Sequence, residues 1–206
     1  MSIVKLPVSL GEAVDKLTIL DIKLERITDH RRKDVETEYL LLKEELKEVV
    51  QKHHLLYRSM KKVNILIWDM MDILRDGDVS DKVYMKVCRE CIEYNDIRFR
   101  VKNKINMVSN SELKEQKSYK TNRLLVEMGA SVSVEECKNH LICVSLFYDE
   151  VIVVSNSNMD TSMLDPTIQV RNDVPSLEFK KKLVLSDVSK LDETFQLTEE
   201  QIQRLL

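Results

Sequence analysis

Residues Pro7 to Leu20 read PVSLGEAVDKLTIL, and this stretch decides where the first helix begins. Ser9 can accept a hydrogen bond from the backbone N–H of Glu12, whose carboxylate can accept one from the N–H of Ser9. This reciprocal pattern is a capping box, and it predicts a helix from Leu10 to about Ile27. Apolar residues recur at helical spacing on more than one side of this segment, which predicts a central helix covered by neighbours.

Composition predicts a mainly α-helical protein. The 206 residues include only three glycines and three prolines, which favours long helices with short connections. Apolar periodicity predicts a second, long helix from Arg32 to Lys62, with the lone His53 on its apolar face. A helix of this length suggests a helical hairpin or a coiled coil. A short third helix is expected from Ile65 to Arg75, and a fourth from Ser80 to Val108.

The pattern changes near residue 120. Short apolar runs at residues 124–128, 150–154, 167–170 and 182–185 predict strands. A capping box at Ser133 and Glu136 predicts a helix that ends near Phe147, and residues 198–201 predict a third box that opens a terminal helix. Strand, glycine turn, helix and strand is the order of a βαβ unit. We therefore expect a helical bundle or coiled-coil domain over residues 1–119 and a small α/β region over residues 120–206.

Charge and hydropathy argue against several classes of function. The net charge of −3 offers no general attraction for nucleic acid or an anionic membrane. No apolar run approaches the roughly 20 residues that a membrane span needs, and the N-terminus does not have the pattern of a signal peptide. The four cysteines are typical of reduced thiols, so we expect a cytoplasmic protein.

Four polar residues share one face of the fourth predicted helix, namely Asn95, Arg98, Lys102 and Asn106. One interpretation is a hydrogen-bonded network at the edge of the core. The other is an anion site, because two cations flanked by two amides suit a phosphate or carboxylate.

The first predicted helix also carries polar residues that need an explanation. Glu12 and Lys16 have the spacing and order of a stabilising helical pair. Alternatively, Glu12, Asp15 and Lys16 line a groove against another helix.

Two further patterns are candidates for ligand sites. Cys88 and Cys91 form a C-x2-C pair and Cys137 with His140 forms a C-x2-H pair, which together could bind zinc, or the thiols are simply buried. The turn at Gly129 could approach a phosphate at a helix N-terminus, or it serves plain α/β packing. No glycine-rich nucleotide motif accompanies this turn, and we assign no catalytic residue, cofactor or metal.

Several spaced stretches resemble a small uncharacterised family found in bacteria and some large DNA viruses. They are Pro7 to Arg26, residues 67–75, Tyr94 to Asn106 and residues 111–119, so the resemblance covers about residues 3–119. Relatives tend to carry an acidic pair where this chain has Met71 and Asp72. The resemblance implies a helical protein associated with glycosyltransferase and surface-polysaccharide functions. Residues 146–154 look faintly like the first βαβ unit of a two-Rossmann glycosyltransferase.

The resemblance and the polar patterns together give one set of candidate site residues. They are Glu12, Asp15, Lys16, Trp68, Arg75, Asn95, Asp96, Arg98, Lys102 and Asn106. We expect a non-enzymatic helical interaction or scaffold protein, accessory to glycan assembly, that forms homo-oligomers or binds a protein partner through its helices. The alternatives are a degenerate or partial glycosyltransferase-like component that binds a nucleotide sugar, and a regulator stapled by zinc.

Overall fold

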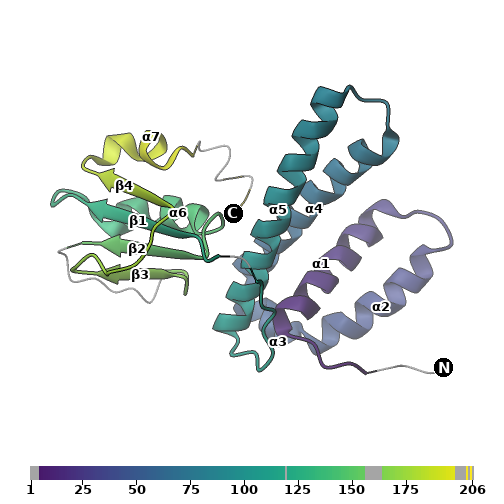
Figure 1. The fold of residues 1–206 in the computed structure, drawn as a ribbon. Helices are drawn as coiled ribbons and strands as arrows, with labels where there is room; N and C mark the ends of the chain where they lie inside the picture. The colour runs from purple at the N-terminus through teal and green to yellow at the C-terminus, as the bar shows by residue number, and fades with distance from the viewer. Residues whose placement is uncertain (1–4, 119, 156–163, 198–202, 204, 206) are drawn as a thin grey trace. The chain divides into compact units, whose positions relative to one another are not determined.

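The chain forms two compact units, residues 1–116 and residues 117–206. The computed structural model describes residues 5–118, 120–155, 164–197, 203 and 205 (Figure 1). The first unit is helical and the second contains a parallel sheet, which confirms the expected mainly α fold with a small α/β part. The capping box expected at residues 198–201 lies outside the described residues. None of the described helices is long and apolar enough to cross a membrane.

Helix α1 (Leu10–Arg26) is the centre of the helical unit. It contacts α2 (Arg32–Glu45), α4 (His54–Asp76) and α5 (Asp81–Val108), so its apolar residues are covered on several sides. Val14, Leu17 and Ile22 are almost completely buried. The sequence prediction of a central first helix is confirmed.

The prediction of one long helix from Arg32 to Lys62 is wrong. The chain leaves helical geometry at Leu46 and again at His53, so that α2, the short α3 (Lys47–Lys52) and α4 are separate (Figure 1). These two breaks let both α2 and α4 contact α1, which a single straight helix could not do over its whole length. His53 therefore lies half-buried at a helix junction rather than on a core face, and the third helix expected at Ile65–Arg75 is the end of α4.

The capping box expected at Ser9 forms only in part. The Ser9 hydroxyl accepts from the backbone N–H of Glu12 at 3.1 Å, and α1 begins at Leu10 as predicted. The Glu12 carboxylate instead pairs with the ammonium group of Lys102 at 2.9 Å. A full charge is a stronger partner for a carboxylate than a backbone N–H, which explains the exchange.

Gly11 is required by the close approach of α1 and α5. A Cβ atom at this position would lie 2.3 Å from the backbone carbonyl oxygen of Lys102 and 2.9 Å from Oδ1 of Asn106. The first of these neighbours is backbone inside a helix, so it cannot move aside cheaply. Only glycine therefore allows the two helices to meet at this point.

The second unit is built on a four-stranded parallel sheet with strand order β3-β2-β1-β4. The strands are β1 (Arg123–Met128), β2 (Glu150–Val154), β3 (Ile168–Arg171) and β4 (Lys181–Leu185). Helix α6 (Val134–Val144) connects β1 to β2, and the 3-10 turn η1 (Val188–Lys190) and α7 (Leu191–Phe195) follow β4. The four expected strands and the capping box of Ser133 with Glu136 are confirmed, although α6 ends at Val144 rather than Phe147.

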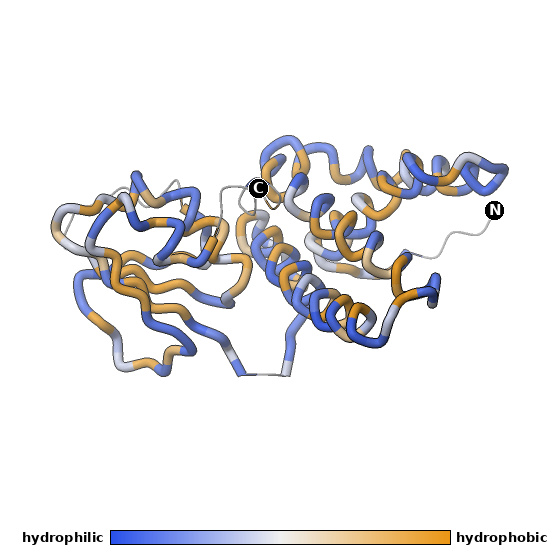
Figure 2. Tube along the Cα trace, turned by 90° about the horizontal axis from the view of Figure 1, so that it is seen from above, coloured by the Kyte–Doolittle hydropathy of each residue, from blue (hydrophilic) through white to orange (hydrophobic). Residues whose placement is uncertain are grey.

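The central strand β1 carries the core of this unit. Leu124, Leu125 and Val126 are consecutive and all fully buried, as expected for a parallel strand that is covered on both faces. Figure 2 shows this concentration of apolar residues in the strands, whereas apolar and polar residues alternate along the helices of the first unit.

The close approach at Gly11 makes a prediction about stability. We expect Gly11→Ala to destabilise the helical unit by about 3 kcal/mol, because the added methyl group clashes with backbone. The control is Gly77→Ala, where a Cβ has open space and the cost is about 1 kcal/mol from the positive φ of 72°. Urea unfolding followed by fluorescence of Trp68, the only tryptophan, measures both. Equal losses for the two variants would contradict the role of Gly11.

Candidate functional site

The polar residues of α1 and α5 meet around one buried carboxylate. Asp15 is only 1% exposed, and the guanidinium of Arg98 donates to both of its oxygens, with Nη2 at 2.5 Å from Oδ2 and Nε at 2.9 Å from Oδ1. Asn64 of α4 donates to Asp15 at 2.8 Å and to the hydroxyl of Thr18 at 2.9 Å. Three helices therefore contribute to one hydrogen-bonded cluster.

This cluster favours the charged form of its cation. The hydrogen bonds from Arg98 to Asp15 raise the pKa of the guanidinium, and this effect outweighs the desolvation that would lower it. A two-pronged arginine–carboxylate contact also fixes the orientation of both side chains. The Asp15–Arg98 pair therefore sets the position of α5 relative to α1.

A second ion-paired group lies about one helical turn away. The ammonium group of Lys102 contacts Glu12 at 2.9 Å and Glu115 at 2.6 Å. Desolvation alone would lower the pKa of Lys102, but the hydrogen bonds to Glu115 and Glu12 reverse this and raise it. Arg98 and Lys102, the two cations of the predicted anion site, thus both have carboxylate partners within the helical unit.

The N-terminus of α1 is also occupied by side chains. The N–H of Gly11 donates to Oδ1 of Asn106 at 2.7 Å, and the N–H of Leu10 donates to the Ser111 hydroxyl at 3.1 Å. Together with the Ser9 cap on Glu12, these bonds satisfy the first three N–H groups of the helix. The Leu10, Gly11 and Glu12 N–H groups are therefore already bonded within the unit, and an external anion would have to displace these partners.

The remaining predicted residues lie outside this cluster. Lys16 pairs with Glu38 of α2 at 2.5 Å, so the expected helical pair of Glu12 with Lys16 is wrong. Asn95 is exposed and Asp96 is half-buried on α5.

Trp68 and Arg75 belong to a separate group of contacts on α4. The guanidinium carbon of Arg26 lies 5.5 Å from the Trp68 ring centroid, and the Arg26 guanidinium also contacts Asp69 at 2.6 Å. Arg75 is exposed near the end of α4 and lies 3.8 Å from Asp72.

The two candidate zinc-ligand pairs belong to different units. Cys88 and Cys91 are on α5, whereas Cys137 and His140 are on α6. His140 contacts Asp192 at 2.7 Å, and burial raises the pKa of the Cys137 thiol to about 11. Among the described residues, no group of three or more His, Cys, Asp or Glu side chains is arranged to hold a metal ion.

The strand order of the second unit places a topological switch point between β1 and β4. In open parallel sheets, ligands bind beyond the carboxyl ends of the strands at such a point. Here the N–H of Gly129 donates to the carbonyl of Leu185 at 2.8 Å, which joins the two strand ends directly. The nearby N-terminus of α6 carries the carboxylate of Glu136, which accepts from the N–H of Ser133 at 3.0 Å. The predicted turn at Gly129 therefore lies at the switch point. The adjacent N-terminus of α6 already donates a hydrogen bond to the carboxylate of Glu136.

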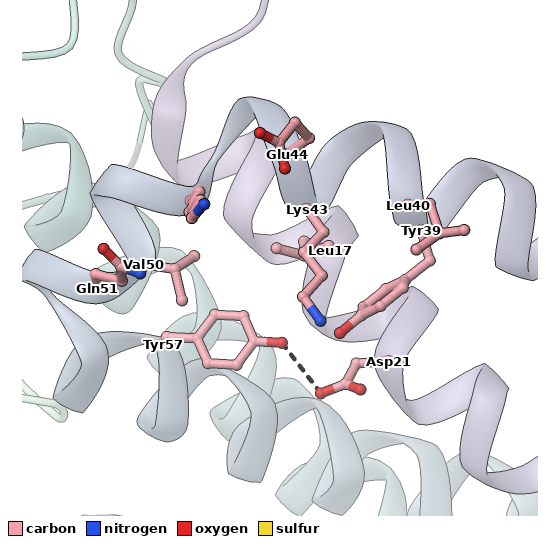
Figure 3. Close-up of a pocket in the computed structure, with 10 residues that line it drawn as sticks. Leu17, Asp21, Tyr39, Leu40, Lys43, Glu44, Val50, Gln51 and Tyr57 are labelled. Carbon is pink, nitrogen blue, oxygen red and sulfur yellow. Dashed lines mark hydrogen bonds between the residues drawn. The ribbon is translucent and has the colours of Figure 1, made fainter.

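A pocket that the sequence did not reveal lies among α1, α2, α3 and α4. Its volume is about 580 Å³, and Asp21, Tyr39, Lys43 and Tyr57 are among its lining residues (Figure 3). The Tyr57 hydroxyl donates to Asp21 at 3.0 Å. The sequence signal was weak, because these residues come from three helices whose arrangement depends on the breaks at Leu46 and His53.

Comparison with known protein families places the chain in one of them. Residues 4–130 match the model of a family of unknown function, DUF6165, and the chain belongs to this family. The expected membership of an uncharacterised family is thereby confirmed in its general form. No curated protein and no solved structure matches the chain.

The Asp15 cluster makes a prediction about stability. Asp15→Ala should cost about 3 kcal/mol of unfolding free energy, because it leaves the half-buried guanidinium of Arg98 without its acceptor and removes one of the two acceptors of the Asn64 amide. Glu12→Ala is the control, with a loss below about 1 kcal/mol expected for an exposed carboxylate. Urea unfolding monitored at Trp68 measures both variants. A loss at Asp15 no larger than the loss at Glu12 would show that this pair does not hold the helices together.

Proposed function

We propose that the protein is a non-enzymatic helical interaction protein that self-associates through α5 and serves as an accessory scaffold in glycan assembly. One observation carries the proposal, namely an outward apolar stripe on the first half of α5.

The reducing interior of the cell is the expected location, since the four cysteines are free thiols.

The stripe consists of Tyr84, Met85, Cys88 and Ile92. These residues fall within about 100° of each other at 100° per residue, so they form one face of the helix. Met85 is 52% exposed and Ile92 is 66% exposed. The core residues of α5 lie on the other side, which gives this helix two apolar faces. Single exposed apolar residues are common, but three exposed apolar side chains on one helix face, with the half-buried Cys88 between them, favour an interaction surface.

A second copy of the chain fits this stripe because the stripe is self-complementary. In an antiparallel pairing about a two-fold axis at Cys88, Tyr84 faces Ile92 of the second copy and the two Cys88 thiols meet. Pairing of one surface with itself is the usual arrangement in homodimers.

The polar cluster supports a binding role rather than a chemical one. Asp15, Arg98 and Lys102 all have ionic partners within the helical unit, and their interactions fix the packing of α1 against α5. The glycan part of the proposal is supported by the resemblance of residues 3–119 described above.

Self-association is tested with Ile92→Glu, which places a charge at the most exposed point of the stripe. We expect the wild-type protein to sediment as a dimer and Ile92→Glu as a monomer in analytical ultracentrifugation. Glu93→Lys, one residue further along and off the stripe, should remain dimeric. Mild oxidation should link two wild-type chains through Cys88 and leave Cys88→Ser unlinked. A monomeric wild-type protein at high concentration would contradict the proposal.

A second candidate function is binding of a nucleotide sugar by the sheet unit. The observation in its favour is the strand order β3-β2-β1-β4, which is that of the first four strands of a dinucleotide-binding fold. Gly129 and Ser131 lie at the switch point of this sheet, where a diphosphate would bind.

Thermal unfolding with UDP-glucose at millimolar concentration tests this candidate. A ligand that binds only the folded protein raises its melting temperature. We expect an increase that is lost in Ser131→Trp, which fills the space beyond β1, and retained in Ser189→Trp on η1. No increase for the wild-type protein would exclude the nucleotide-sugar candidate and leave the proposal of self-association in place.

A further inference from the structure

We propose that the pocket among α1, α2, α3 and α4 binds a nucleoside monophosphate, with the phosphate on two lysines and the base against two tyrosines. This inference is independent of the self-association of α5 and of the switch point in the sheet unit. It rests on the charges, rings and size of the pocket.

The pocket has a suitable size for such a ligand. Its volume of about 580 Å³ falls within the range of small-molecule sites, which is roughly 300–1,000 Å³. All of its lining residues belong to the helical unit. Four helices contribute to the wall, so a bound molecule would contact side chains from each of them (Figure 3).

Two lysines supply positive charge to the pocket wall, which also carries the exposed carboxylate of Glu44. Lys43 of α2 and Lys47 of α3 line the pocket on either side of the break at Leu46, and neither forms an ion pair with any described residue. The Lys43 ammonium lies 5.3 Å from the Tyr39 ring centroid. By contrast, Lys16, Lys61 and Lys102 of the same unit all contact carboxylates. Lys43 and Lys47 are thus the cations of this pocket that remain available to an anion.

Two acidic residues line the pocket, and one of them, Asp21, has partners within the wall. Asp21 accepts from the Tyr57 hydroxyl at 3.0 Å and contacts the ammonium of Lys61 at 2.7 Å. Burial, followed by the nearby Asp21 charge, raises the pKa of Tyr57, so its hydroxyl stays protonated and continues to donate. The negative charge of Asp21 is therefore balanced within the wall, and the solvent-exposed Glu44 is the remaining carboxylate beside the two lysines.

Two aromatic rings provide a surface for a flat group. Figure 3 shows the rings of Tyr39 and Tyr57 directed into the same space, with Lys43 beside them. Leu17 and Val50 add apolar wall. Aromatic side chains stack on nucleobases of any sequence, and lysine binds phosphate as a point charge. In a nucleoside monophosphate, the phosphate would contact the lysines and the base would contact the tyrosine rings.

Titration calorimetry of the full chain with AMP and UMP tests the proposal. We expect saturable binding of at least one of them, weakened about tenfold in Lys43→Gln and in Lys47→Gln by loss of a charge-assisted contact. Lys52→Gln, an exposed position on α3 outside the pocket, should bind like the wild-type protein. Thermal unfolding of each variant verifies that it is folded.

Separate probes identify which chemistry is recognised. Adenosine and inorganic phosphate should each bind at least tenfold more weakly than AMP, and Tyr39→Leu should weaken AMP without changing the binding of phosphate. The proposal is overturned by the absence of binding at millimolar AMP and UMP, or by phosphate that binds as tightly as AMP. It is also overturned if Lys43→Gln binds like the wild-type protein, or if Ser131→Trp abolishes binding, because the ligand would then belong to the sheet unit.

Discussion

A buried carboxylate needs a cation in a fixed place, and the helical unit is arranged around that requirement at Asp15. The contacts between α1 and α5 run in opposite directions along the two helices: Gly11 meets Asn106, Glu12 meets Lys102 and Asp15 meets Arg98. A shift of either helix by one turn would break all three contacts at once. Breaking a buried pair is costly even where the pair itself adds little net stability, so the cluster specifies one register for the two helices.

Local signals made much of the fold predictable. The start of α1 at Ser9, the extent of α5 and the four strands all follow from caps and apolar periodicity, which neighbouring residues determine. The breaks at Leu46 and His53 could not be predicted in this way. They depend on the packing of α2 and α4 against α1, and the apolar pattern of residues 32–62 continues across them without a glycine or proline.

The sequence allowed us to predict which residues belong to the candidate site, but not which side chains contact one another there. The sequence singled out Asp15 and Arg98 because polar side chains stood beside apolar stripes, yet 83 residues separate them and no local pattern connects them. The pocket around Tyr57 was missed for a related reason. Its residues are ordinary on each helix taken alone, and only the turn of the chain through α3 brings Tyr39 and Tyr57 to one cavity.

The strand order of the sheet unit has a consequence for the order of folding. Helices α1 and α2, and likewise α4 and α5, are neighbours in the sequence, so most contacts of the helical unit can form once residue 116 has left the ribosome. Strand β1 must wait longer, because Leu124 pairs with Lys181 of β4. Until then one edge of an apolar strand remains open to other chains. A ribosome that stalls between these two strands would release a finished helical unit with an aggregation-prone tail.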